Sequence, residues 1–276
     1  MRPRQASGLN FLLLTYDSCR YDVLGDADTP VLDAYGGIHP AQAPANFTFA
    51  SHQAFFVGIL PNADEDLPYL NRFRKQLLGL VEVGEPQVAK EAFERVRSRW
   101  NLVSGLRDRG YQTVGAGAMN WFRQESLTAG FERFRFTGRD AEAQVRFVRE
   151  ELDVERPFFA FINFGETHAP YTFRGSEGAC PVDVRARRMR WPPRAEQGPT
   201  GADNPGYAWQ QAAAEFLDGR LPRLFEGLPG DTAVILTADH GECFGEDGYW
   251  GHGVNHEKVL EVPLAIFRLD RGPLEP

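Results

Sequence analysis

The chain has 276 residues and a net charge of −8, with 42% hydrophobic and 25% charged residues. This composition is ordinary for a soluble globular protein, and the length allows a full hydrophobic core. The negative charge argues against a nucleic-acid partner, because binding to nucleic acid needs clustered positive charge. An anionic substrate would need a local positive centre, which a metal ion could supply.

The three cysteines, Cys19, Cys180 and Cys243, lie far apart and show neither a disulfide framework nor zinc-ribbon spacing. The apolar run at 11–14 is too short for the core of a signal peptide or for a membrane span. We therefore expect a cytoplasmic protein without a membrane partner.

Short apolar runs in the first two thirds of the chain are typical of strands buried on both faces. They cover residues 11–15, 113–118 and 158–164. A helical pattern at 89–109 precedes the second run and stops at Gly110.

The last third begins with an amphipathic helix at 208–228, which Pro222 is expected to kink or divide. Two further apolar runs, at 232–236 and 262–267, predict strands. Because strands alternate with helices, we expect one α/β domain over 1–276, with a mainly parallel central sheet and helices on both faces.

Two irregular insertions, near 62–90 and 174–205, interrupt this pattern. The second is rich in proline and glycine and carries the basic cluster Arg185, Arg187, Arg188 and Arg190. A loop of this length is either a solvated insertion or a substrate-binding element, and the sequence leaves both open.

Polar side chains follow three of the predicted strands. Asp17 follows the first, Glu166 and His168 follow the strand at 158–164, and Asp239 and His240 follow the strand at 232–236. Ligands of open α/β sheets bind beyond the carboxyl ends of the strands, so one shared site is the simplest expectation.

The run Thr-Ala-Asp-His-Gly-Glu at 237–242, followed by Gly-His-Gly at 251–253, is the most informative stretch. Asp239 and His240 offer one oxygen and one nitrogen ligand from adjacent residues. That pair suits Zn²⁺ or Mn²⁺ better than Ca²⁺, which takes oxygen almost alone. Taken alone, the pair could also be a polar loop that closes a strand.

Four segments in order resemble the alkaline phosphatase superfamily, in its sulfatase-like and phosphodiesterase-like branch. They are 10–24 with Asp-Ser-Cys-Arg, 43–61 around the Thr-Phe-Ala-Ser-His window, 163–171 with His-Ala-Pro-Tyr, and 237–264. The resemblance covers nearly the whole chain. Relatives commonly continue past the last of these segments into a smaller sheet, so the resemblance implies a truncated carboxyl-terminal subdomain.

The nucleophile of this chain is expected to be a threonine. The window at 48–52 lacks the cysteine motif that becomes formylglycine in sulfatases, and Thr48 stands ten residues before Gly58, as the family's nucleophile does. The resemblance therefore implies Thr48 as nucleophile, with Ser51 as its rival. A threonine hydroxyl needs a metal ion to hold it as the alkoxide. A simple helix cap is the alternative role for Thr48.

The resemblance also implies a metal site made by Asp17, Thr48, Asp239 and His240. Zinc or manganese is expected there, with calcium or magnesium as alternatives. The aspartate that binds a second metal in two-zinc relatives would fall on Phe164, so one metal site is expected and a second is left open.

Several more polar residues are candidates for contact with the substrate. By resemblance, His168 and His252 either act in catalysis, contact the anionic oxygens or bind a second metal. His52 and Asn46 could contact the substrate, and Glu166 could assist a second metal. Four acidic residues could orient histidines or merely solvate a loop: Glu242, Glu246, Asp247 and Glu257.

The implied activity is hydrolysis of a small anionic phosphate ester, mono- or diester, through a covalent intermediate on Thr48. Three alternatives stay open: hydrolysis of a sulfate ester, transfer of a phosphoryl group to a small-molecule acceptor in biosynthesis, and a non-catalytic metal-binding module. The sequence makes no prediction of oligomeric state.

Overall fold

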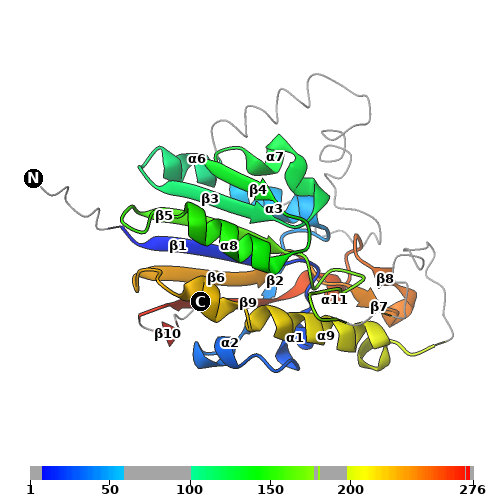
Figure 1. Cartoon of the computed structure of the whole chain (residues 1–276). Coiled ribbons are helices and arrows are strands. Elements are labelled where there is room, and N and C mark those ends of the chain that lie inside the picture. The colour runs from blue at the N-terminus through cyan, green and yellow to red at the C-terminus, as the bar shows by residue number, and fades with distance from the viewer. Residues whose placement is uncertain (1–7, 59–100, 177–179, 181–197, 271, 274–276) are drawn as a thin grey trace, which may run out of the picture.

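The computed structural model describes residues 8–58, 101–176, 180, 198–270 and 272–273. Within these residues, an eight-stranded sheet has the order β10-β9-β6-β1-β5-β3-β4, and β2 pairs with β9 (Figure 1). None of the described helices combines the length and the apolar character needed to cross a membrane.

The central strands of this sheet are parallel, as the sequence predicts. β1 (Asn10–Tyr16) lies between β5 (Phe158–Phe164) and β6 (Thr232–Ala238). β3 (Gln112–Gly117) runs parallel to β5, and β4 (Arg133–Phe136) runs parallel to β3. All residues of β5 are buried, which explains why its sequence is a continuous apolar run rather than an alternating one.

One edge of the sheet is antiparallel. β9 (Glu261–Arg268) pairs with β6, and β2 (His39–Gln42) and β10 (Gly272–Pro273) both pair with β9 in the antiparallel sense. The sheet is therefore mixed, with mostly parallel strands. The apolar run at 262–267 predicts the last long strand but carries no signal of its direction.

Helices cover both faces of the sheet, as predicted. One face packs against α1 (Tyr21–Gly25), α2 (Pro30–Ala34), α8 (Ala141–Glu151), α9 (Pro205–Asp218) and α10 (Leu221–Phe225). The other face packs against α3 (Thr48–Val57), α6 (Leu102–Arg107), α7 (Glu125–Thr128) and a 3₁₀ turn, η1 (Asn120–Arg123). The side chains of β1 alternate between them: Leu12 and Leu14 join the first cluster, and Phe11 and Leu13 the second.

Short elements complete the described fold beyond the carboxyl ends of the parallel strands. β7 (Cys243–Phe244) and β8 (Trp250–Gly251) form a small hairpin around η3 (Glu246–Gly248), and α11 (Glu257–Leu260) leads into β9. A further 3₁₀ turn, η2 (Gly201–Asp203), precedes α9.

Proline divides the helix predicted at 208–228. The structure contains two helices instead, α9 and α10, and Pro222 lies in the first turn of α10, where its missing N–H costs nothing. Of the helix predicted at 89–109, the described part is α6, and Gly110 follows it with a φ of 90°.

The predicted insertions lie largely outside the described residues. The interval 62–90 and the cluster Arg185, Arg187, Arg188 and Arg190 lie wholly outside them. Of the interval 174–205, the structure describes 174–176, 180 and 198–205.

A buried glutamine on α9 joins two loops at the carboxyl ends of the sheet. Gln210 Nε2 donates to the carbonyl oxygens of Ser18 and Thr167, at 2.9 Å each, and Arg20 N donates to Gln210 Oε1 at 3.3 Å. The loop after β1 and the loop after β5 are thus held to the same side chain.

Replacing this side chain should destabilise the fold. Gln210→Leu leaves three buried backbone groups without partners, so we expect the free energy of unfolding to fall by roughly 2–4 kcal/mol. Urea unfolding measures the change. The neighbouring Gln211, whose side chain donates to Asp26 O at an exposed position, is the matched control. Gln211→Leu should change stability by less than about 0.5 kcal/mol, and equal losses in the two variants would contradict the assignment.

Candidate active site

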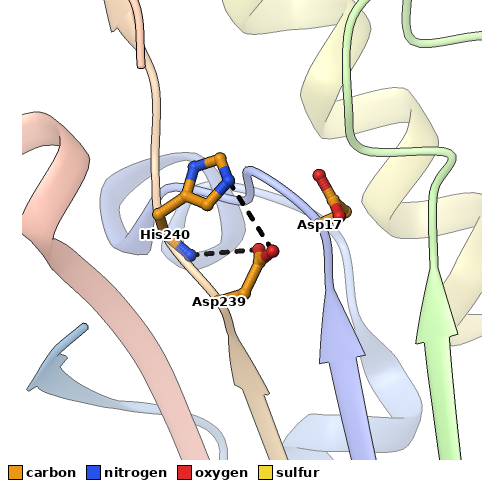
Figure 2. A group of neighbouring side chains, drawn as sticks. All are labelled: Asp17, Asp239 and His240. Carbon is orange, nitrogen blue, oxygen red and sulfur yellow. Dashed lines mark hydrogen bonds and ion pairs between the residues drawn. The ribbon is translucent and has the colours of Figure 1, made fainter. Parts of the chain in front are cut away.

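The site is built where β1 and β6 end side by side. Tyr16 and Ala238 are opposite each other in the parallel register, so Asp17 and Asp239 leave the sheet at the same level. One ligand atom each from Asp17, Asp239 and His240 lies within 4.8 Å of the others, and all three residues are fully buried (Figure 2). The sheet register therefore creates the cluster that the sequence predicts.

The carboxylate of Asp239 has one oxygen fixed and one oxygen unpaired. Oδ1 accepts hydrogen bonds from Ser18 N and His240 N, both at 3.0 Å. Oδ2 is buried without a hydrogen-bond partner among the residues that the structure describes, 3.6 Å from His240 Nε2. Burial raises the pKa of Asp239 to about 6. An orphaned carboxylate oxygen at this depth fits a cation ligand, because a bound cation would satisfy it.

Asp17 is held from three directions. Asn163 Nδ2 on β5 lies 3.3 Å from Asp17 Oδ2, Thr48 Oγ1 lies 3.4 Å from the same oxygen, and Ser18 Oγ donates to Oδ1 at 3.2 Å. Burial and the nearby Asp239 carboxylate both raise the pKa of Asp17. Two buried carboxylates that repel each other in this way also fit a site for a divalent cation.

His240 presents the ring nitrogen that a metal needs. Its Nδ1 lies 2.8 Å from Gly241 O, so Nδ1–H donates to that carbonyl and the Nε2 lone pair faces Asp239 and Thr48. Burial lowers the pKa of His240 to about 4. The imidazole is therefore neutral, the form that binds metals.

The Thr48 hydroxyl lies inside this cluster. Thr48 is the first residue of α3, and Oγ1 is 3.4 Å from both Asp17 Oδ2 and His240 Nε2. The residue at the cap position is Phe47, so the capping role considered for Thr48 is wrong. The rival nucleophile, Ser51, donates from Oγ to Ala45 O at 3.2 Å instead.

His252 reaches the same space from the β7–β8 hairpin. Its ring centroid lies 4.4 Å from that of His240 and 5.3 Å from that of His168. Its Nδ1 lies 3.2 Å from Glu242 Oε1. Burial alone would lower the pKa of His252, but the hydrogen bond and charge of Glu242 outweigh it and raise this pKa above its ordinary value.

No family model matches the sequence. A stretch of 65 residues, 24% of this chain, is 48% identical to a phosphopentomutase of Pectobacterium atrosepticum. A longer stretch of 156 residues, 52% of this chain, is 30% identical to the low-salt glycan biosynthesis sulfotransferase Agl7 of Haloferax volcanii. The first match spans 14% of the phosphopentomutase and the second 36% of the sulfotransferase, so each match covers only part of the relative.

Solved structures cover much more of the chain. A phosphonate monoester hydrolase of Agrobacterium radiobacter aligns with 94% of this chain and 68% of its own, with a TM-score of 0.59 and 16% identity. The periplasmic domain of phosphoethanolamine transferase EptC from Campylobacter jejuni aligns with 95% of this chain and 80% of its own, with a TM-score of 0.57 and 13% identity. A Vibrio parahaemolyticus protein of the alkaline phosphatase superfamily aligns with 98% of this chain and 62% of its own, with a TM-score of 0.59 and 17% identity. The chain has the alkaline phosphatase-like fold.

In this alkaline phosphatase-like fold, His168 follows β5 and faces His252. Its Nδ1 lies 2.7 Å from Ala169 O and 3.1 Å from Arg139 Nη2, and Arg139 Nη1 also donates to His168 O at 3.3 Å. Burial lowers the pKa of His168 to about 4. Arg139 had no signal in the sequence, because it lies in a loop 29 positions from the histidine that it contacts.

The other two predicted substrate contacts are engaged within the protein. His52 lies under Thr48, with Nδ1 2.8 Å from Thr48 O and Nε2 3.0 Å from Thr15 Oγ1. Burial among aromatic rings lowers the pKa of His52 to about 3. Asn46 Nδ2 donates to Asn255 Oδ1 at 2.8 Å and joins the turn before Thr48 to the loop after His252.

The acidic candidates have different partners. Glu166 accepts from the backbone N–H groups of Ala141 and Gly165, at 2.8 and 3.1 Å, and thereby holds the start of α8. Glu246 pairs with the buried Arg20, and Asp247 with His256. Glu257 pairs with Lys258. Glu242, by contrast, lies beside a predicted site residue, with Oε1 3.2 Å from His252 Nδ1.

The glycine between His240 and Glu242 is required by close packing. Gly241 N donates to Val259 O at 2.7 Å, and a Cβ on Gly241 would overlap the carbonyl oxygen of Lys258. The backbone of α11 therefore lies directly against the segment that carries Asp239 and His240.

We expect Gly241→Ala to displace this motif. The overlap is with backbone atoms that cannot rotate away, so the free energy of unfolding should fall by about 1–3 kcal/mol. Thermal and urea unfolding measure the loss. Gly25, at the end of α1, has open space at its Cβ position, and Gly25→Ala should change stability by less than about 1 kcal/mol. An equal change in the free energy of unfolding of the two variants would contradict the close packing at Gly241.

Proposed function

We propose that this protein catalyses the metal-dependent hydrolysis or transfer of a small phosphate ester, with Thr48 as nucleophile. The observation that carries the proposal is the position of Thr48 Oγ1, 3.4 Å from both Asp17 Oδ2 and His240 Nε2. A hydroxyl buried among acidic and imidazole groups adds little to the stability of the fold. The same arrangement suits an activated nucleophile.

The donor set fits one divalent cation. Asp17, Thr48, Asp239 and His240 would hold it with three oxygens and one nitrogen, which favours zinc or manganese over calcium. When bound, such a cation supplies positive charge that stabilises Thr48 in its alkoxide form and offsets the charge of the ester. Phe164 stands where two-zinc relatives carry the aspartate that binds a second metal. Because phenylalanine cannot bind a metal ion, we propose a single metal.

The residues of the chain supply the other elements of the reaction. Thr48 Oγ attacks phosphorus in line, and the bond to the leaving alcohol breaks as the new bond to Thr48 forms. His252 donates a proton from Nε2 to the departing oxygen, because its Nδ1 is already held by Glu242. Attack by water, or by a second alcohol, then releases Thr48. We propose that the N–H groups at the start of α3 and the neutral His168 bind the anionic oxygens, since α3 begins at Thr48 and His168 lies beside His252.

Two related activities fit the same geometry. A sulfate ester has the same tetrahedral shape, and one relative by sequence is a glycan sulfotransferase. Transfer rather than hydrolysis is supported by that relative and by the phosphopentomutase match. We place phosphate ester hydrolysis or transfer first because the phosphopentomutase match has the higher identity.

The proposed substrate is a small anionic ester, and no nucleic-acid or membrane partner is proposed. The cytoplasm stays a prediction, since the similar EptC domain is periplasmic.

Thr48 variants test the proposal directly. Thr48→Ala should reduce turnover of p-nitrophenyl and bis-p-nitrophenyl phosphate by at least about 10³-fold, because the nucleophile is lost. Thr48→Ser should retain part of the activity. Mass spectrometry of the acid-quenched reaction should find phosphate on the peptide that contains Thr48. Ser51→Ala is the control with a nearby hydroxyl. Turnover by Thr48→Ala within a few-fold of wild type would overturn the assignment, and preferential turnover of p-nitrophenyl sulfate would move the substrate class to sulfate esters.

Metal binding is tested by elemental analysis and thermal unfolding. The purified protein should bind about one zinc or manganese ion per chain, and the metal at 100 times its Kd should stabilise the fold by about 2.7 kcal/mol. Asp239→Asn should weaken metal binding at least tenfold, because it removes a charged ligand. Glu166→Gln alters a buried acid outside the cluster and should leave the metal content unchanged. Loss of metal in both variants, or in neither, would contradict the ligand set.

A further inference from the structure

Glu242 connects the two loops that carry His168 and His252. Its Oε2 accepts a hydrogen bond from Tyr171 Oη at 2.5 Å, and its Oε1 lies 3.2 Å from His252 Nδ1. Tyr171 is fully buried and lies three residues after His168, while Glu242 is 2% exposed. His252 retains 26% of its side-chain exposure, so it lies between a buried anchor and the open side of the site.

We propose that Tyr171 and Glu242 are positioning residues that fix the ring of His252 so that Nε2 faces the departing oxygen of the substrate. This inference rests on the proposed function. It assigns a role to two side chains that neither bind the expected metal nor touch the substrate.

The hydrogen-bond pattern determines the orientation of the ring. A carboxylate only accepts, so the ring atom beside Glu242 Oε1 must be a nitrogen that carries a proton, and Nδ1 occupies that place. A ring flip would put a carbon there and would lose the bond. Nε2 is then the nitrogen that points away from Glu242, in a ring whose centroid lies 4.4 Å from that of His240 and 5.3 Å from that of His168.

Tyr171 fixes the carboxylate in turn. Its hydroxyl holds Oε2, which leaves Oε1 for His252, and its ring packs edge-on against Phe244 at 6.2 Å. The backbone of Glu242 is also held, because Arg20 Nη1 donates to Glu242 O at 3.3 Å. Arg20 itself is anchored by Asp22 and Glu246. The backbone carbonyl and the Oε2 atom of Glu242 are therefore both held by hydrogen bonds. This fixes the position of Oε1 beside His252 Nδ1.

The alternative is that Glu242 only packs the hairpin against the β5 loop. If Glu242 only packed the hairpin, its replacement would lower turnover by the same factor for every substrate. Positioning of a proton donor predicts a loss that grows as the leaving group becomes poorer, because a poor leaving group depends more on protonation.

The first measurement is independent of turnover. In protein labelled with ¹⁵N at its six histidines, with and without added Zn²⁺, the Nδ1 signal of His252 should be that of a protonated nitrogen. The His252→Gln variant assigns it. The signal should shift in Glu242→Gln and, less, in Tyr171→Phe. Asp247→Asn removes an exposed acid of the same segment, 83% exposed and paired with His256, and should leave it unchanged. An unprotonated Nδ1 in the wild type, or an unchanged signal in Glu242→Gln, would overturn the inference.

The second measurement compares a good and a poor leaving group. Glu242→Gln should lower kcat for p-nitrophenyl esters by about tenfold and for phenyl esters by about 100-fold, with little change in KM or in metal content. Equal losses for both esters would indicate packing alone and would count against the inference. If the wild type neither hydrolyses an ester nor transfers its phosphoryl group to an added alcohol, the proposed function fails, and the ring-nitrogen measurement still decides the role of Glu242.

Discussion

The structure depends on two buried carboxylates that lie next to each other. The parallel pairing of β1 and β6 places Asp17 and Asp239 at adjacent strand ends, fully removed from water. Such a pair is costly without a cation, and the unpaired Oδ2 of Asp239 shows where that cost is concentrated. A buried pair of this kind lowers the stability of the free protein, and a bound cation would offset that loss.

The loops around this pair are held by neutral hydrogen bonds, close packing and the ion pairs of Arg20. Gln210 ties the loop after β1 to the loop after β5, and Gly241 lies against the backbone of α11. Arg20 links the β1 loop to the β7–β8 hairpin through its buried guanidinium. These contacts add no further carboxylate to the centre, so the surrounding loops are fixed without increasing the repulsion between Asp17 and Asp239.

The four histidines near Thr48 differ in the direction of their pKa shifts because their surroundings differ. His240 and His52 face backbone carbonyls, and burial keeps both neutral. His252 faces the carboxylate of Glu242, and its pKa is raised instead. His168 is neutral beside the guanidinium of Arg139. Imidazoles with the same intrinsic chemistry thus differ in pKa because their surroundings differ, and the different roles proposed for them rest on this difference.

The sequence by itself predicted the buried strands and the polar residues that follow them. An apolar run buried on both faces, such as β5, is a local pattern, and so is a polar residue at the end of a strand. The partners that hold the loops carrying those polar residues are not local. Gln210 lies 192 positions from Ser18, and Glu242 lies 71 positions from Tyr171. Only the tertiary structure brings these side chains together, because a hydrogen bond depends on distance and angle in space, which the order of residues along the chain does not record.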